Sequence, residues 1–143
     1  MNTGGMNPAA RAARTAPSPT GLNAEFYERA ARDGLHLQRC TACDAWRHPP
    51  RFLCAACGST DWRWERASDR GRVFSWTVTH RAIDPAFADA LPYMIVVVEL
   101  DEGVRVVGNL VGAGPDALAL DLPVVVDLDR RSDTVALIDF RPA

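Results

Sequence analysis

Every cysteine of this 143-residue chain lies in one short stretch, "CTACDAWRHPPRFLCAAC", at residues 40–57. The four cysteines form two C-x-x-C pairs, and ten residues separate one pair from the other. A C-x-x-C turn places two thiolates on one side of a tight loop, and two such loops complete a tetrahedral cage. The spacing therefore predicts a bound metal ion whose ligands are Cys40, Cys43, Cys54 and Cys57.

The expected cellular compartment favours a metal over disulfides. No apolar run is long enough to cross a bilayer, and the arginines near the N-terminus are not followed by the apolar region of a secretion signal. We therefore expect a cytoplasmic protein, with no membrane association, whose thiols stay reduced. Two disulfides, a redox dithiol or four unrelated thiols are the alternatives. Zinc is the expected metal and iron its main rival. A cage closed by four sulfurs is structural, because it has no open position for a substrate.

The sequence on either side of the cage divides into distinct parts. Residues 1–21 are rich in Gly, Pro, Ala, Ser and Thr without an apolar face, so we predict a disordered tail. Residues 22–34 are predicted to form an N-terminal helix, and residues 35–67 the zinc ribbon, with one strand before the first cysteine pair and one after the second. Because so short a helix is marginal alone, its Phe26 and Tyr27 must pack on something, either this chain's own domain or another chain.

Residues 68–143 change to a pattern of short strands with period two. The segment "YMIVVVEL" is apolar on both faces, which suggests a central strand, and the turn "DEG" after it favours a hairpin with "VRVVGNLV". With "RVFSWTVTH", "PVVVDLD" and "TVALIDF" there are five strands, and an OB-type barrel is the common five-stranded solution. The predicted fold is mainly β: an N-terminal helix, a four-cysteine zinc ribbon, then a five-stranded OB-type β-barrel.

Charge and histidine content argue against two broad classes of function. All 16 basic residues are arginine and the formal net charge is −2, so there is no general case for nucleic acid or an anionic membrane as a partner. The histidines are His36, His48 and His80, and none stands near a carboxylate or nucleophile at a useful spacing. With the cysteines bound to metal, no thiol remains as a nucleophile. We expect that this chain catalyses nothing by itself.

Aromatic and arginine side chains around the cage are the remaining candidates for binding. Trp62 and Trp64 alternate on one strand face, and Trp46 lies in the loop between the cysteine pairs. The simplest interpretation is that they cover the ribbon's own small core. The alternative is a docking surface, because Trp and Arg are enriched in interface hot spots. Arg47 and Arg51 flank the Pro pair and could bind a phosphate.

Four motifs carry a resemblance to a known family: "FYERAARDGLHLQRCTAC", "HPPRFLCAACGSTDWRWERASDRGRVFSWTVTH", "LPYMIVVVELDEGVRVVGNLVG" and the closing "FRP". Over residues 23–141 the chain resembles the acyl-CoA-associated OB-fold family with a rubredoxin-like zinc ribbon, also called domain of unknown function 35. It departs from that family at Asp44, where a knuckle glycine is usual. Further departures are Ala55, where Pro often follows the third cysteine, and Asp121, where Gly is usual before the last strands.

The resemblance implies a non-catalytic partner of a thiolase-fold enzyme. Members look like accessory subunits of lipid-transfer-type thiolases, including retro-aldolases that act on steroid side-chain CoA thioesters. Others resemble bridges between an acetoacetyl-CoA thiolase and a 3-hydroxy-3-methylglutaryl-CoA synthase. By resemblance, this chain would dock on such an enzyme and complete or shield the channel for an acyl-CoA bound by the complex. The residues expected to contact the partner or the acyl-CoA are Phe26, Tyr27, Trp46, Arg47, Arg51, Trp62 and Trp64.

Two other functions remain open from the sequence alone. A module that binds single-stranded nucleic acid is one, because zinc ribbons and OB barrels commonly bind such strands. Its basic groove is missing, since Asp127, Asp129 and Asp133 surround the main arginine cluster of the barrel. A free acyl-CoA carrier or sensor is the other, and it would use Arg47 and Arg51.

Overall fold

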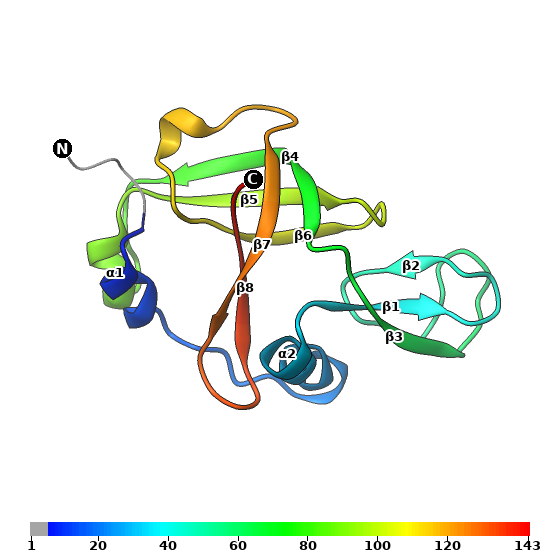
Figure 1. Cartoon of the computed structure of the whole chain (residues 1–143). Coiled ribbons are helices and arrows are strands. Elements are labelled where there is room, and N and C mark those ends of the chain that lie inside the picture. The colour runs from blue at the N-terminus through cyan, green and yellow to red at the C-terminus, as the bar shows by residue number, and fades with distance from the viewer. Residues whose placement is uncertain (1–5) are drawn as a thin grey trace.

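The structure, a computed structural model that describes residues 6–143, contains a three-stranded ribbon and a closed five-stranded barrel (Figure 1). The order of the elements confirms the predicted mainly-β fold. Within residues 6–143, no helix is both long and apolar enough to cross a membrane. In chain order the elements are α1 (Pro8–Ala13), α2 (Gly21–Asp33), β1 (His36–Cys40), β2 (Trp46–Arg47), β3 (Trp62–Arg66), β4 (Arg70–Thr79), the 3-10 helix η1 (Pro85–Ala90), β5 (Tyr93–Leu100), β6 (Arg105–Leu110), the 3-10 helix η2 (Pro115–Ala117), β7 (Pro123–Arg130) and β8 (Ala136–Pro142).

Strict alternation along β5 builds the core of the barrel. Met94, Val96, Val98 and Leu100 are buried, and the residues between them are turned outward. β5 pairs antiparallel with β4 on one side and with β6 on the other, as predicted for a central strand. Gly103 has a φ of +83° in the turn that joins β5 to β6, a conformation that glycine adopts without strain. The barrel order is β4-β5-β6-β8-β7.

The barrel closes through a very short contact between β6 and β8. These strands are parallel and pair only at Asn109 with Asp139 and at Leu110 with Phe140. A Cβ atom on Gly108 would collide with the carbonyl oxygen of Ile138 and with the ring of Phe140. The glycine therefore allows the two strands to approach closely enough to close the barrel.

The ribbon, α2 and the barrel share one hydrophobic core. Phe26 and Ala30 of α2 are buried together with Leu35 and Leu37, which precede the first cysteine pair, and all four belong to the same cluster as the barrel interior. Figure 1 shows α2 beside β8 and below β1. The helix that the sequence predicted to be marginal alone is therefore held by the protein's own domain.

The structure corrects the prediction of a disordered tail over residues 1–21. Residues 1–5 lie outside the described part of the chain, but residues 6–20, here called the N-terminal strap, are folded onto the barrel. Met6 forms a parallel β-bridge with Val111 and is buried. The strap has too few apolar residues to predict this, because its main contacts are polar and reach strands far along the chain.

Two arginines of the strap make the most buried of these contacts. The Nη2 atom of Arg14 lies 2.6 Å from Oδ2 of Asp139, and only 3% and 1% of these side chains are exposed. Arg11 pairs with Asp139 and Asp127 at 2.9 Å each, and Arg14 also pairs with Asp129 at 2.9 Å. Burial opposes the charge of Arg14, but hydrogen bonds and attraction from the aspartates outweigh it and raise its pKa. The strap is thus tied to β7 and β8.

Candidate metal centre and the outer face of the barrel

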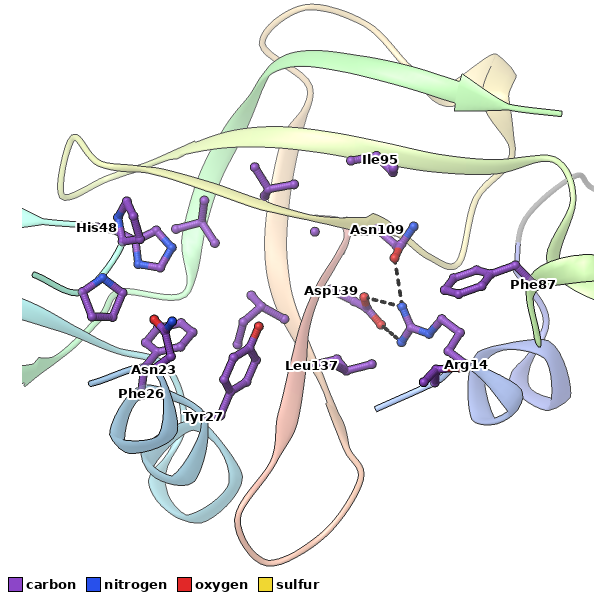
Figure 2. A pocket seen from close by; sticks show the side chains of 17 residues that line it. Arg14, Asn23, Phe26, Tyr27, His48, Phe87, Ile95, Asn109, Leu137 and Asp139 are labelled. Atoms are coloured by element: carbon purple, nitrogen blue, oxygen red, sulfur yellow. Dashed lines mark hydrogen bonds and ion pairs between the residues drawn. The ribbon is translucent and has the colours of Figure 1, made fainter. Parts of the chain in front are cut away.

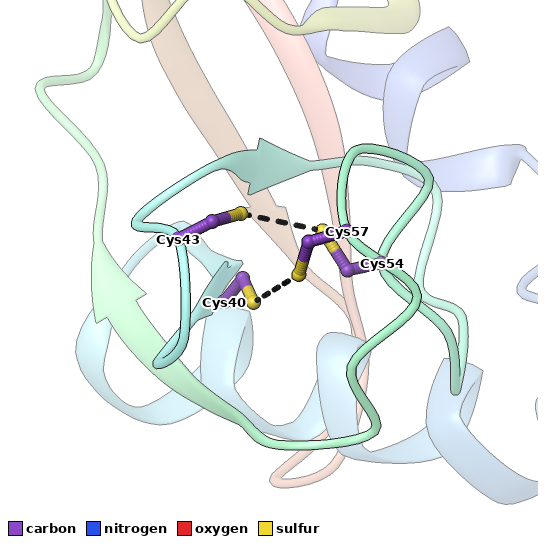
Figure 3. Close-up of side chains that lie close together, drawn as sticks. All are labelled: Cys40, Cys43, Cys54 and Cys57. Carbon is purple, nitrogen blue, oxygen red and sulfur yellow. Dashed lines mark hydrogen bonds between the residues drawn. The ribbon is translucent and has the colours of Figure 1, made fainter.

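The four cysteines come together as the sequence predicts. Their Sγ atoms all lie within 4.8 Å of one another, with 3.7 Å from Cys40 to Cys57 and 3.6 Å from Cys43 to Cys54 (Figure 3). Four thiolates at about 2.3 Å from a tetrahedral zinc would be separated by about 3.8 Å, so the donors fit such an ion. Cys40 and Cys54 are buried, whereas Cys43 and Cys57 are exposed residues. The arrangement is that of a zinc ribbon.

In each loop, backbone N–H groups donate to the first cysteine, Cys40 or Cys54, and lower the pKa of its thiol. Backbone N–H groups of Cys57 and Ala56 donate to Cys54 and lower the pKa of its thiol to about 6. The backbone N–H of Ala45 lowers the pKa of the Cys43 thiol, but the neighbouring thiols and burial outweigh this effect and raise that pKa to about 12. Four negative sulfurs therefore do not coexist here unless a cation lies among them.

At two turns where the family pattern has glycine, an aspartate adopts the left-handed backbone conformation. Asp44 has a φ of +63°, close to the +75° of Gly58 in the other loop, and Asp121 has a φ of +62°. The carbonyl oxygen of Asp44 accepts a hydrogen bond of 3.0 Å from Nε of Arg39. Aspartate tolerates the left-handed region better than most residues, so both departures from the family pattern keep the turn that a glycine would make.

The residues predicted to contact a partner or an acyl-CoA are divided between the interior and the surface. Phe26 is 5% exposed and Arg47 is 7% exposed, so neither offers its side chain to another molecule. Phe26 packs against His48 and Trp64, with ring centroids 5.1 Å and 6.4 Å apart. Arg51 is exposed. Four of the seven are half-buried: Tyr27, Trp46, Trp62 and Trp64.

Arg47 is fixed inside the ribbon. Its Nε donates to Oε1 of Gln38 at 3.1 Å, and its guanidinium lies 5.8 Å from the centroid of Trp62. Its two terminal nitrogens are buried without a hydrogen-bond partner in the described part of the chain. The cation is therefore held by packing and by the aromatic ring. This removes one of the two arginines that a free acyl-CoA carrier would use.

Several exposed apolar side chains were missed by sequence reasoning. Phe52 and Leu53, at the tip of the loop before Cys54, are 71% and 57% exposed. On the barrel, Phe74 and Trp76 are 46% and 39% exposed, although their alternation in the sequence is typical of a buried face. A register shift between Val73 and Ser75 interrupts the alternation along β4, and a pattern count does not reveal it.

The surface formed by β6 and β8, together with Ile95 of β5, carries a cleft of about 450 Å³ (Figure 2). In OB folds, the second and third barrel strands form the usual ligand surface, and β5 and β6 are those strands here. Arg14 of the strap lies on this surface, where its Nη1 donates to Asn109 and to Asp139 at 3.0 Å each. A single nucleic-acid strand on this face would meet the strap and aspartates rather than free cations.

The three histidines have different surroundings. Nδ1 of His36 lies 2.8 Å from the carbonyl oxygen of Gly34, and His80 is exposed after β4. His48 lines the cleft, and burial together with the nearby Arg51 charge lowers its pKa to about 4. Within residues 6–143, none of the side-chain hydrogen bonds joins a histidine to a carboxylate. A neutral His48 can exchange hydrogen bonds with a ligand.

Comparison with known proteins gives two family matches in tandem. Residues 28–63 match the family model described as ChsH2, rubredoxin-like zinc ribbon domain. Residues 64–129 match the family model described as ChsH2, C-terminal OB-fold domain. The two matches follow the ribbon and the barrel seen in the structure.

Curated relatives carry two kinds of name. The chain is 42% identical over 133 residues to a probable enoyl-CoA hydratase alpha subunit of Thermomonospora curvata, covering 93% of this chain and 41% of that protein. It is 36% identical over 108 residues to the 3-oxo-4,17-pregnadiene-20-carboxyl-CoA hydratase alpha subunit of Mycobacterium tuberculosis, covering 76% and 34%. A DUF35 domain-containing scaffold protein of Methanocaldococcus jannaschii is 31% identical over 87 residues, covering 60% and 61%. The chain thus spans less than half the length of the two hydratase subunits.

A solved structure agrees with these relatives. The chain named Ltp2-ChsH2(DUF35) aldolase superposes with a TM-score of 0.79 at 42% identity, over 88% of this chain and 98% of that one. The tandem family matches, the relatives and this superposition agree with the ribbon, the barrel and the four-cysteine cage. The chain therefore belongs to the ChsH2/DUF35 family of paired zinc-ribbon and OB-fold domains.

Proposed function

We propose that this chain is a non-catalytic accessory subunit that docks on a thiolase-fold, lipid-transfer-type enzyme. In this role it supports cleavage or formation of a carbon–carbon bond in an acyl-CoA, including retro-aldol cleavage of steroid side-chain CoA thioesters. The CoA thioester is bound by the complex, at or near the subunit interface. The observation that carries the proposal is the likeness to the Ltp2-ChsH2(DUF35) aldolase chain, which this chain covers almost completely.

The scaffold name of the archaeal relative supports an accessory role rather than a catalytic one. The hydratase names belong to proteins of which this chain matches 41% and 34%, so their activity is not assigned to the matched part. The four-sulfur cage agrees with this, because it leaves no coordination position for a substrate. The nucleophile and the acid–base groups would come from the partner subunit.

Docking would use the side chains that the structure leaves exposed around the ribbon. Among the predicted contacts, Arg51 is exposed and its guanidinium pairs with no side chain of residues 6–143, and the neighbouring Phe52 and Leu53 add exposed apolar side chains. Aromatic and arginine side chains are typical anchors of interfaces. Phe52 and Leu53 are held in place by the ribbon, because the next residue, Cys54, belongs to the four-cysteine cage.

Co-purification tests the proposal. Tagged full-length chain with its metal is captured from nuclease-treated lysate of its source, and the bound proteins are identified by mass spectrometry. A thiolase-fold protein in near-stoichiometric amount, together with an acyl-CoA lyase activity that requires both subunits, would support the proposal. The Arg51→Glu variant should capture less of this protein, whereas Arg130→Glu, also exposed but in the barrel, should not differ. Well-folded chain that binds no thiolase-fold protein of its source would refute it.

A further inference from the structure

The cleft on the outer face of the barrel is built by several separate parts of the chain. β6 and β8 form its floor, and Figure 2 shows Tyr27 on α2 at one side and Arg14 of the strap at the other. The loop with His48 closes the end near Asn23. Its volume of about 450 Å³ falls in the range of small-molecule sites, roughly 300–1,000 Å³. The strap and α2 thus reduce an open OB-fold surface to a site that fits a small molecule.

The charges at this cleft are already balanced within the chain. Arg14 uses every N–H of its guanidinium: Nε donates to the carbonyl of Arg11, and the terminal nitrogens donate to Asn109, Asp129 and Asp139. Asp139 in turn is neutralised by both Arg11 and Arg14. Among the described residues that line the cleft, none offers a free cation for a phosphate or a free carboxylate for an amine.

At the end of the cleft opposite Arg14, uncharged polar groups have no hydrogen-bond partner among residues 6–143. The hydroxyl of Tyr27, the amide of Asn23 and the ring nitrogens of His48 make no hydrogen bond to residues 6–143, and all three residues line the cleft. With its low pKa, His48 is neutral near pH 7. These groups can donate to and accept from amides, hydroxyls or carbonyls of a neutral ligand.

Apolar side chains line the middle of the cleft. Ile95 and Val107 come from the barrel strands, Leu137 lies on β8, and Phe87 of η1 lies at the end near Arg14 (Figure 2). Val107 is 60% exposed although it lies on a strand. An elongated, mainly apolar ligand with neutral hydrogen-bonding groups would bury these apolar side chains and form hydrogen bonds with Tyr27, Asn23 and His48.

We propose that this cleft binds the uncharged acyl-pantetheine arm of a thioester, because its walls are apolar, its ions are paired and its free polar groups are neutral. The assignment of the ligand rests on the proposed function, in which the complex acts on acyl-CoA. An alkyl chain with two amides, a hydroxyl and a thioester matches this mixture of groups. The 3′-phosphoadenosine diphosphate part of CoA does not, because it needs cations that are free. That part would lie outside the cleft.

Nuclear magnetic resonance of the full-length, metal-loaded chain gives a direct test. Octanoyl-pantetheine is titrated into labelled protein, and 3′-phosphoadenosine 5′-diphosphate is titrated separately. We expect saturable shifts of backbone amides at Tyr27, Val107 and Leu137 with the first compound and none there with the second. Absence of saturable shifts at the cleft, or equal shifts with the nucleotide, would overturn the proposal.

A matched pair of variants locates the site. Val107→Asp places a charge on the floor of the cleft, and we expect it to weaken binding of octanoyl-pantetheine by about tenfold or more. Leu120→Asp makes the same change at a side chain that is 69% exposed and does not line the cleft, and its binding should equal that of the unmodified chain. Equal binding by both variants would refute the assignment to this cleft.

The failure of this inference can be told from the failure of the proposed function. Capture of a thiolase-fold protein is measured with the unmodified chain and does not use the cleft probe. Capture without probe binding would refute the cleft assignment and leave the accessory role standing. Binding of octanoyl-pantetheine without capture of a thiolase-fold protein would support the cleft assignment and refute the accessory role. The chain would then be a free carrier.

Discussion

The carboxylate of Asp139 lies 2.6 Å from the guanidinium of Arg14, and both side chains are almost completely buried. Asp139 belongs to β8 and Arg14 to the strap, so this pair joins segments that are 125 residues apart. It also forms one end of the cleft. The pair therefore connects the stability of the fold with the shape of its outer face.

Arg14→Ala should destabilise the protein by about 3 kcal/mol, because it leaves a buried carboxylate with one partner instead of two. Urea unfolding followed by tryptophan fluorescence measures this change. Arg130→Ala is the control, since Arg130 and Asp133 form a pair whose side chains are 59% and 92% exposed. We expect a loss of only a few tenths of a kcal/mol there. Similar losses in both variants would show that the buried pair has no special role.

His48 should make stability depend on pH. Its pKa is about 4 in the fold, against an ordinary value of 6.5 for a histidine in water, so protonation favours the unfolded chain. The stabilisation is complete above pH 6.5 and is lost as the pH falls toward 4, by up to about 3 kcal/mol. His48→Gln should flatten this part of the curve in urea unfolding at several pH values, whereas His80→Gln should keep the slope. An unchanged slope in His48→Gln would contradict the burial argument.

Gly108→Ala should open the barrel. The added methyl would collide with the carbonyl of Ile138 at the point where β6 and β8 meet, and we expect a loss of about 3 kcal/mol or more. Gly103→Ala has free space but keeps a φ of +83°, so its cost should be about 1 kcal/mol. Thermal unfolding of the two variants measures the loss of stability from a collision in Gly108→Ala against the loss from backbone strain in Gly103→Ala. A larger loss at Gly103 would reverse the interpretation.

Removal of the metal should unfold the ribbon. Three of the four tryptophans, Trp46, Trp62 and Trp64, lie there, so a strong chelator should abolish much of the near-ultraviolet circular dichroism. Cobalt should restore the signal, with the visible absorption of a tetrahedral thiolate site. Cys54→Ser should bind cobalt more weakly and lose that absorption, whereas Ser59→Ala, close to the cage, should keep it. A chelated protein with an unchanged spectrum would show that the cage is not needed for folding.

The cysteine spacing predicted the cage, because a short local motif contains all four ligands. The period-two segments predicted the barrel for the same reason, since alternation along β5 is visible within eight residues. The turn at Asp44 shows that a departure from the family pattern need not change the backbone, as its φ is +63°.

Features that depend on distant partners were not predictable in this way. Arg11 and Arg14 are found in a stretch with the composition of a disordered tail, and their aspartate partners lie 115 to 128 residues later. Phe26 was named as a contact for a partner or an acyl-CoA but is buried, because it packs in the core that α2 shares with the ribbon and the barrel. The cleft has no sequence signature, since it is formed where several distant segments meet.

The attachment of the strap also sets an order of events during synthesis. The cysteines lie within 18 residues of one another, so the cage can form as soon as the ribbon has left the ribosome. The strap is translated earlier, yet it cannot be fixed until Asp127, Asp129 and Asp139 have followed. Contacts of such long range form late and slow the folding of a domain. We therefore expect a segment that emerges before the ribbon to be fixed only after β7 and β8 have formed, and the outer face of the barrel to remain uncovered until then.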